Sequence, residues 1–409
     1  MKNKTAKLLL KDGTEYLGKS FGAEKNMSGE VVFATGMVGY PEALTDPSFR
    51  GQILVLTFPL VGNYGVPKKE FWESEKIQVS GLVVCNYIDT PSHCDMEKTL
   101  GKWLKEQKVP ALEIKDTRGL TQKLRTEGVM LGGINFGKKK IKFDDPNERN
   151  LAAEVSTKKI RIFNPTPNPS PKGRGNSSNY LLNPSPLGRG KGRGKKEKTV
   201  VLIDCGAKQN IIKSLVKRNL KVVVVPWDTD VTKLPFAFDA VVISSGPGDP
   251  KKVESTIENT RKIFEKQIPI LGICLGNQIL ALALSGTTYK LKFGHRSQNQ
   301  PVVEKNTKKC YLTTQNHGFA VGQIPHDFVE WFHNANDKTN EGIIHKNLPV
   351  MSVQFHPESS PGPLDTDWIF DFFLEKAGVY AFRHSHSILE KQGRFGRSED
   401  SSKHVHQLF

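Results

Sequence analysis

The second half of the chain alternates between short, continuously apolar runs and amphipathic segments of helical length. The apolar runs include "TVVLID" at 199–204, "KVVVVP" at 221–226 and "IPIL" at 268–271, and "KQNIIKSLVKRNL" at 208–220 has helical spacing. Continuously apolar strands separated by helices are typical of parallel sheets covered on both faces. This pattern predicts that residues 199–377 form an α/β domain with a doubly wound, mostly parallel sheet. In such domains the candidate sites lie at the carboxyl ends of the strands.

The first half has a different pattern of apolar positions. "KLLLKDGTEYLGKS" at 7–20 alternates apolar and polar residues around a central Asp-Gly pair, which predicts a β-hairpin. Further short apolar runs are separated by glycine and proline. The segment from Thr117 to Gly128 predicts a helix that Thr117 caps and Gly128 closes. We expect residues 1–155 to form a mixed α/β domain.

A change of composition separates these two halves. Residues 165–198 contain the repeat "NPSPKGRG" and "NPSPLGRG", with eight basic residues against one acidic residue, or +7 of the formal net charge of +17. Such a segment lacks the apolar residues needed for a core, so we interpret it as an inserted, disordered linker. It also lacks the interleaved aromatic residues that stack on bases, so we expect no nucleic-acid partner. Residues 378–409 form a second polar segment, interpreted as a tail.

The cysteines and the apolar runs indicate in which cellular compartment the protein is expected. Five cysteines, an odd number without CxxC spacing, fit neither a disulfide framework nor a zinc site. No apolar run approaches the roughly 18 residues of a membrane span, and the N-terminus lacks a secretory signal. No GxxxxGK[ST] phosphate loop is present. We expect a cytoplasmic protein that holds no metal or cofactor and does not bind a membrane.

One cysteine occupies a distinctive position. "GICLGNQ" at 272–278 places Cys274 between Gly272 and Gly276, directly after an apolar strand and before a predicted helix. The GxSxG elbow of hydrolases presents its nucleophile on the same strand-to-helix turn. The free N–H groups at the start of the helix favour a thiolate and can hold an oxyanion. Cys274 is therefore a candidate nucleophile.

A base and an orienting carboxylate follow another predicted strand. "PVMSVQF" ends directly before His356, and Glu358 lies two residues further, on the same side of an extended chain. Pro357 favours that extended conformation at the residue before it. Cys274, His356 and Glu358 can thus form a nucleophile, base and carboxylate triad.

Two other segments belong to the same predicted edge of the sheet. "SSGPGDP" at 244–250 carries Gly246 and Gly248, whose backbone N–H groups can complete an oxyanion hole. "TQNHGFAV" at 314–321, which we expect to be a loop, offers polar groups beside an apolar wall.

Together these motifs resemble class I glutamine amidotransferases. The N-terminal "TGMVGYPEALTDPSFRGQILVLTFPLVGNYG" and "DTRGLTQKLR" narrow the resemblance to the small subunits of carbamoyl-phosphate synthetase. It implies that Cys274 attacks the side-chain amide of L-glutamine through a thioester while His356 moves the proton. The residues that it implies for glutamine binding are Gly36, Gly246, Gly248, Leu275, Gln278, Asn316, Gly318 and Phe319.

The resemblance also implies a partner. In the family, ammonia passes through a tunnel to a large subunit, which binds ATP and Mg²⁺ and makes carbamoyl phosphate from bicarbonate for arginine and pyrimidine synthesis. A heterodimer that can assemble further is expected. Two alternatives stay open: the amidotransferase subunit of another synthase, and an inactive scaffold whose basic linker contacts nucleic acid.

Overall fold

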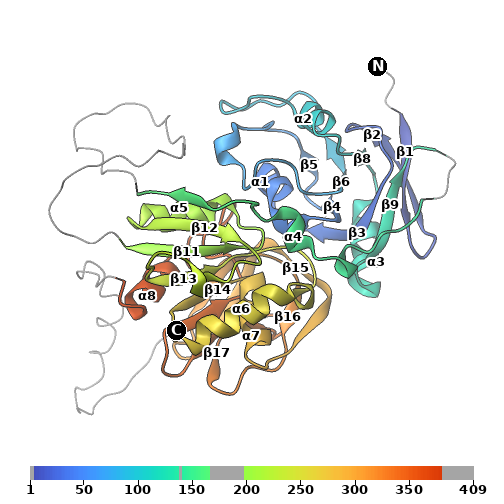
Figure 1. Cartoon of the computed structure of the whole chain (residues 1–409). Coiled ribbons are helices and arrows are strands. Elements are labelled where there is room, and N and C mark those ends of the chain that lie inside the picture. Colours follow the sequence, from blue (N-terminus) through green and yellow to red (C-terminus); the bar gives the residue numbers. More distant parts are fainter. Residues whose placement is uncertain (1–3, 138–140, 166–197, 380–409) are drawn as a thin grey trace, which may run out of the picture.

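A computed structural model describes residues 4–137, 141–165 and 198–379, in two parts that lie side by side (Figure 1). The first part, coloured blue to teal, contains a closed barrel. The second part, coloured green to red, contains a ten-stranded sheet. Residues 166–197 of the predicted linker and residues 380–409 of the predicted tail lie outside the described residues.

The barrel combines parallel and antiparallel pairs of strands. Its spatial order is β1 (Thr5–Leu10), β2 (Glu15–Ser20), β8 (Ala111–Glu113), β6 (Gly81–Val84), β4 (Gln52–Leu56), β3 (Met27–Ala34) and β9 (Met130–Asn135). Strands β1 and β2 form the predicted hairpin. In its turn the Asp12 carboxylate accepts a 2.9 Å hydrogen bond from the Thr14 N–H, and Gly13 has a φ of 91°. The Asp-Gly pair therefore acts as the sequence predicts.

Short helices and a small two-stranded sheet surround this barrel. They are α1 (Tyr40–Thr45), η1 (Pro47–Phe49), η2 (Lys69–Phe71), α2 (Leu100–Glu106), α3 (Thr117–Glu127) and the strands β5 (Leu60–Val61) and β7 (Asn86–Tyr87). The predicted cap of α3 was wrong by one residue. Asp116, not Thr117, caps the helix, because its carboxylate accepts a 2.8 Å hydrogen bond from the Gly119 N–H. Gly128 closes the helix as predicted.

A short segment connects the barrel to the large sheet. It contains η3 (Pro146–Glu148), α4 (Leu151–Val155) and β10 (Arg161–Phe163), and β10 pairs antiparallel with β12 of the large sheet. The Asp204 carboxylate also accepts a 2.7 Å hydrogen bond from the Thr157 N–H. The chain therefore joins the second part before the predicted linker begins.

Five parallel strands form the centre of the large sheet, as predicted. In spatial order they are β12 (Lys221–Pro226), β11 (Thr199–Asp204), β13 (Ala240–Ile243), β14 (Ile270–Ile273) and β19 (Val350–Val353). Beyond β19 the sheet continues with antiparallel strands: β18 (Asn340–His345), β17 (Phe328–Asn334), β15 (Thr288–Glu304) and β16 (Cys310–Val321). The sheet is thus mixed, and the predicted loop "TQNHGFAV" is wrong because these residues lie in β16.

Helices cover both faces of the parallel centre. Val200 and Leu202 of β11 pack in one core with α5 (Gln209–Lys217) and α8 (Trp368–Lys376). Val201 and Ile203 pack in the opposite core with α6 (Glu254–Glu265) and α7 (Leu275–Ala283). Successive side chains of a strand point to opposite faces, so a continuously apolar strand fills both cores. The short helices η4 (Val231–Lys233) and η5 (Pro250–Lys252) complete this part.

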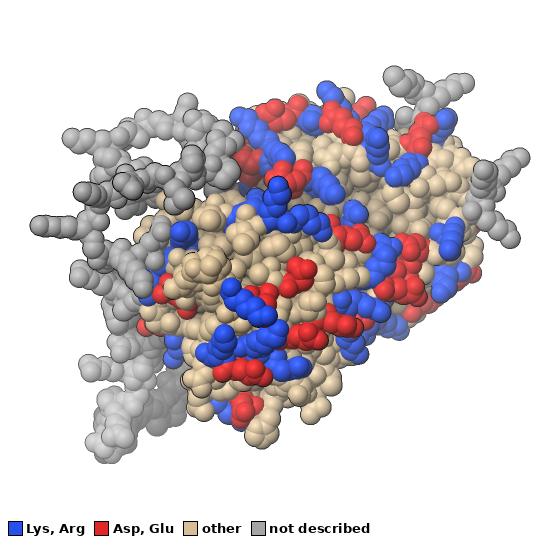
Figure 2. Space-filling model, viewed as in Figure 1, with Lys and Arg blue, Asp and Glu red and all other residues tan. Residues whose placement is uncertain are grey.

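Two surface properties bear on partners. No helix in residues 4–137, 141–165 or 198–379 combines the length and apolar character that a membrane crossing requires. On the face shown in Figure 2, basic and acidic side chains are interspersed among uncharged residues. The described part of that face therefore has no broad basic surface of the kind that binds a phosphate backbone.

Candidate active site

The predicted strand-to-helix elbow is present at Cys274. The residue directly follows β14, precedes the first residue of α7, and has φ 54° and ψ −100°, which is strained for a non-glycine residue. The two flanking glycines are required by close backbone contacts. A Cβ on Gly272 would lie 2.5 Å from the Gly276 carbonyl oxygen, and a Cβ on Gly276 would lie 2.2 Å from the Ile243 carbonyl oxygen. Strand and helix meet too closely for side chains at these positions.

The Cys274 thiol is buried, with 1% of the residue exposed, and has polar neighbours. Its Sγ donates to the Asn316 carbonyl oxygen at 3.7 Å and accepts from Gln354 Nε2 at 3.6 Å. The N–H groups at the start of α7 carry the partial positive charge of the helix N-terminus, which stabilises any negative charge that forms beside the sulfur. The elbow thus has the geometry to present a nucleophile and donors for an oxyanion.

His356 and Glu358 form the predicted pair, and the structure buries it. His356 lies just beyond β19, where its N–H donates to the Thr314 carbonyl oxygen at 2.9 Å. Its Nδ1 lies 2.6 Å from Glu358 Oε1, and both residues are 1% exposed. The other ring nitrogen, Nε2, has no hydrogen-bond partner among the described residues. This leaves Nε2 available for proton transfer.

The charges around this pair control its protonation. Burial alone would lower the pKa of His356, but the negative charges of Glu358 and Cys274 outweigh burial and raise that pKa to about 10. Burial raises the pKa of Glu358, but the charges of His356 and Lys208 lower it below its usual value overall. At neutral pH the pair is therefore an imidazolium beside a carboxylate, ready to donate a proton.

A buried lysine beside this pair was not predicted from the sequence. Lys208 is 2% exposed, and its Nζ lies 3.3 Å from Glu358 Oε1 and donates to the Ser359 carbonyl oxygen at 2.6 Å. Burial lowers the pKa of Lys208, but Glu358, Glu73 and Asp46 raise it overall. Both Glu73 and Asp46 come from the barrel part. In the sequence, Lys208 stands at the start of an amphipathic helix, where a lysine is usually exposed, so no pattern indicated its burial.

One pocket contains Cys274 and most of the residues implied for glutamine binding. Seven of those eight residues line it: Gly246, Gly248, Leu275, Gln278, Asn316, Gly318 and Phe319. Gln278 Nε2 donates to the Phe319 carbonyl oxygen at 2.8 Å, which ties α7 to β16 across the pocket. Gly248, which follows β13, has a φ of 87°, a conformation that glycine adopts without strain.

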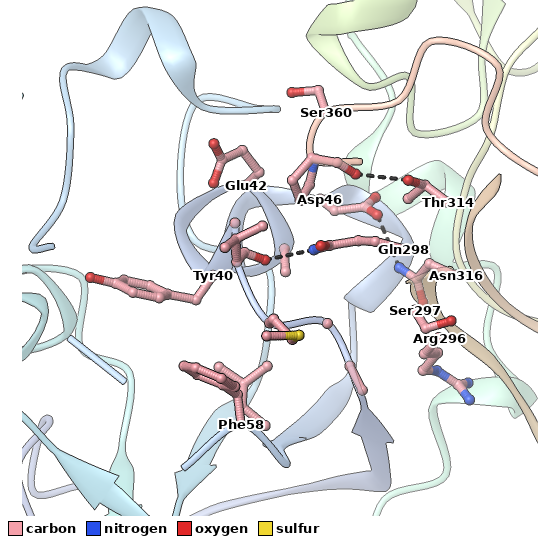
Figure 3. Close-up of a pocket in the computed structure, with 18 of the residues that line it drawn as sticks. Tyr40, Glu42, Asp46, Phe58, Arg296, Ser297, Gln298, Thr314, Asn316 and Ser360 are labelled. Carbon is pink, nitrogen blue, oxygen red and sulfur yellow. Dashed lines mark hydrogen bonds between the residues drawn. The ribbon is translucent and has the colours of Figure 1, made fainter. Parts of the chain in front are cut away.

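Gly36, the eighth residue, lines a neighbouring cavity between the barrel and the sheet (Figure 3). His356 lines this second cavity too, so the two cavities meet at the triad. On its walls Asn316 Nδ2 donates to Asp46 Oδ2 at 2.9 Å, and Gln298 Nε2 donates to the Val38 carbonyl oxygen at 2.6 Å. The barrel and the sheet thus contact each other directly beside the candidate triad.

The barrel also contributes to the pocket of Cys274, a contribution that was not predicted from the sequence. Its contribution consists of Glu30, Ser48 and Gln52, and the connecting segment adds Asn147. The Ser48 hydroxyl is buried and has no hydrogen-bond partner among the described residues. Ser48 and Gly36 both lie in the N-terminal motif that begins "TGMVGYPEALTDPSFRG", so the motif marked the right segment of the chain while a different residue was selected within it. An unpartnered hydroxyl in a pocket is suited to bind a ligand.

Within residues 4–137, 141–165 and 198–379, two groups of side chains have metal-binding donors within reach of one another. His93, Cys94 and Asp95 form an exposed group, whereas His295, His317 and Glu341 form a buried one. In the buried group, His295 Nδ1 lies 3.3 Å from Glu341 Oε1, and its Nε2 lies 2.8 Å from Asp337 Oδ2. The ring nitrogens of His317 lie within hydrogen-bond distance of other groups, the Phe319 carbonyl oxygen at 2.8 Å and Gln315 Oε1 at 3.0 Å. That this chain holds no metal or cofactor stays a prediction.

Comparisons with known proteins agree with this geometry. Residues 201–376 match the family model of class-I glutamine amidotransferases, and residues 8–134 match that of the carbamoyl-phosphate synthase small chain, CPSase domain. The second match separates this chain from amidotransferases that serve other synthases. Together the two models match the barrel and nearly all of the large sheet.

Individual relatives extend the match across the chain. The arginine-specific small chain of carbamoyl phosphate synthase from Aspergillus oryzae is 41% identical over 391 residues, which cover 92% of this chain and 81% of that relative. Multifunctional protein CAD from Squalus acanthias is 45% identical over a match that covers 91% of this chain and 16% of that relative. The mitochondrial carbamoyl-phosphate synthase [ammonia] from Homo sapiens is 43% identical over a match that covers 91% of this chain and 24% of that relative.

This chain spans about a quarter or less of the shark and human relatives, whereas it spans most of the fungal small chain. The identity to that small chain runs through both the barrel and the amidotransferase part. On this evidence the chain belongs to the family of carbamoyl-phosphate synthase small chains.

Proposed function

We propose that this chain hydrolyses L-glutamine and supplies the ammonia to a large synthase chain. The observation that carries the proposal is the position of Cys274, on a strained elbow at the end of β14 and beside the buried pair of His356 and Glu358. A scaffold protein has no need for such a strained nucleophile. Membership of the small-chain family supports the choice of substrate and partner.

In the proposed mechanism the proton of the Cys274 thiol resides on His356 Nε2, and the resulting thiolate attacks the side-chain carbonyl carbon of glutamine. The first N–H groups of α7 and those near Gly246 and Gly248 hold the negative oxygen that forms. His356, protonated because its pKa is raised to about 10, donates a proton from Nε2 to the leaving ammonia. The remaining thioester is cleaved by water, whose proton returns to His356, and glutamate leaves.

The second cavity supports a route for the ammonia. His356 lines that cavity, whereas Cys274 lines the glutamine pocket, so ammonia released between these two residues lies at the border of both. We propose that it leaves through the second cavity toward the large chain. ATP, Mg²⁺ and bicarbonate would bind to that partner. We also propose a cytoplasmic location, supported by five cysteines that are all free thiols.

The test is glutamate release from glutamine by the full chain, alone and with a large chain supplied with ATP, Mg²⁺ and bicarbonate. We expect release that increases with the active partner and disappears in Cys274→Ala. Cys205→Ala is the matched control, because Cys205 is also buried and follows strand β11 but lies outside the pocket. Unchanged release in Cys274→Ala would remove that residue from its role.

A further inference from the structure

Arg296 occupies an unusual position between the two cavities. It lies on β15, is 5% exposed, and lines both the pocket of Cys274 and the second cavity (Figure 3). Its Nη2 lies 3.2 Å from the place that a Cβ on Gly318 would occupy. The guanidinium therefore lies beside the backbone of the glutamine pocket.

This buried cation has few partners. Nη1 donates to the Phe293 carbonyl oxygen at 2.6 Å. Among the described residues, Nε has no hydrogen-bond partner and no carboxylate lies within ion-pair distance of the guanidinium. An arginine keeps its charge in a protein, and a buried charge is costly unless an opposite charge accompanies it. The Arg296 guanidinium is thus positioned to bind an anionic group of a ligand.

Glu30, an acidic residue that lines the same pocket, already has hydrogen-bond donors of its own. Glu30 accepts hydrogen bonds from Lys290 at 2.5 Å, from Asn147 at 3.2 Å and from Gln52 at 3.2 Å. These donors neutralise and saturate its carboxylate. Glu30 contributes to the field at Arg296 from a distance, but it does not pair with the guanidinium.

We propose that Arg296 binds the α-carboxylate of the substrate and so selects free glutamine over glutamine whose α-carboxylate is blocked. The inference rests on the proposed function. With the side-chain amide at Cys274, the α-carboxylate is the only negative charge on glutamine. Its two oxygens match the planar donors of a guanidinium. A glutamine residue within a peptide, or an α-amide, lacks this anion and leaves the buried charge unpaired.

The experiment compares the binding of L-glutamine and of L-glutamine α-amide by isothermal titration calorimetry. The full-length chain carries Cys274→Ala to prevent turnover. Hydrogen bonds to charged groups predict that glutamine binds about 10- to 100-fold more tightly than the α-amide. Arg296→Gln should remove this preference, and Arg296→Lys should keep part of it. Lys292→Gln, which removes an exposed charge four residues away on β15, should leave the preference unchanged.

Each outcome decides the inference. A preference that persists in Arg296→Gln, or no measurable glutamine binding by the parent, would overturn it. If Arg296→Gln loses both ligands, Arg296→Lys decides: a partial preference supports the assignment, and equal loss of both ligands refutes it. The proposed function fails separately. A chain with Cys274 that does not release glutamate, yet prefers glutamine through Arg296, would refute hydrolysis while the carboxylate site stands.

Discussion

Replacing Glu358 with glutamine tests whether the carboxylate controls the protonation of His356. The substitution removes the negative charge 2.6 Å from Nδ1 and nearly preserves the shape of the side chain. The difference between the ordinary His pKa of 6.5 and the value of about 10 corresponds to roughly 5 kcal/mol of favourable interaction with the imidazolium. Glu358 is the largest of the causes that raise this pKa, so most of that interaction should disappear in the variant.

The pKa can be followed directly by NMR of chain labelled at the histidine Cε1 carbon. Loss of one resonance in His356→Gln assigns the signal. In the wild-type chain we expect His356 to remain protonated at pH 8, and in Glu358→Gln we expect its midpoint to fall by at least two pH units. The alkaline limb of the pH profile for glutamate release should move in the same direction. An unchanged midpoint, or a neutral His356 in the wild type at pH 7, would refute the electrostatic argument.

The same raised pKa predicts how folding stability depends on pH. A group whose pKa is higher in the folded state stabilises the fold fully below its unfolded pKa and loses that contribution as the pH rises through its folded pKa. The contribution of His356 should thus be complete below about pH 6.5 and lost toward pH 10. Urea unfolding should show that the stability difference between wild type and Glu358→Gln narrows over this range. A difference that stays constant would contradict the linkage.

Three further substitutions test other parts of the site. Gly276→Ala places a Cβ 2.2 Å from a backbone oxygen and should cost about 2 kcal/mol or more in urea unfolding, whereas Gly137→Ala, with no atom within 4 Å, should not. Lys208→Met removes the buried positive charge beside Glu73, Glu358 and Asp46 and should destabilise the fold by about 3 to 5 kcal/mol; a stable variant would show that Glu73, which lacks the imidazolium partner of Glu358, is neutral. Ser48→Ala should raise the KM for glutamine several-fold with little change in kcat, and an unchanged KM would place the hydroxyl outside the binding interaction.

The elements that depend on local pattern could be predicted from the sequence. The strands β11, β12 and β14 are continuously apolar, and their alternate residues fill both cores, so their parallel arrangement followed from composition alone. The elbow at Cys274 and the pair of His356 and Glu358 were predicted from the positions of residues just beyond strands. Each of these features needs only a short segment of chain to be recognised.

The features that depend on contacts between distant segments could not be predicted. Strand β15 contains buried polar residues such as Arg296, and register shifts interrupt its pairing with β16, so neither strand shows a regular alternation. The burial of Lys208 depends on Glu73 and Asp46 of the barrel, which are more than 100 residues away in the sequence. Ser48 lies opposite Cys274 only because the barrel packs against the sheet.

The contact between Asn316 and Asp46 has a consequence for protein engineering. Asn316 lies on the strand that borders Cys274, yet its side chain donates to a carboxylate of the barrel. An amidotransferase part grafted onto a foreign N-terminal domain would lack this acceptor, and with it Glu73 and Ser48. The two parts are therefore not interchangeable modules, and an exchange between relatives would have to carry both halves of this boundary together.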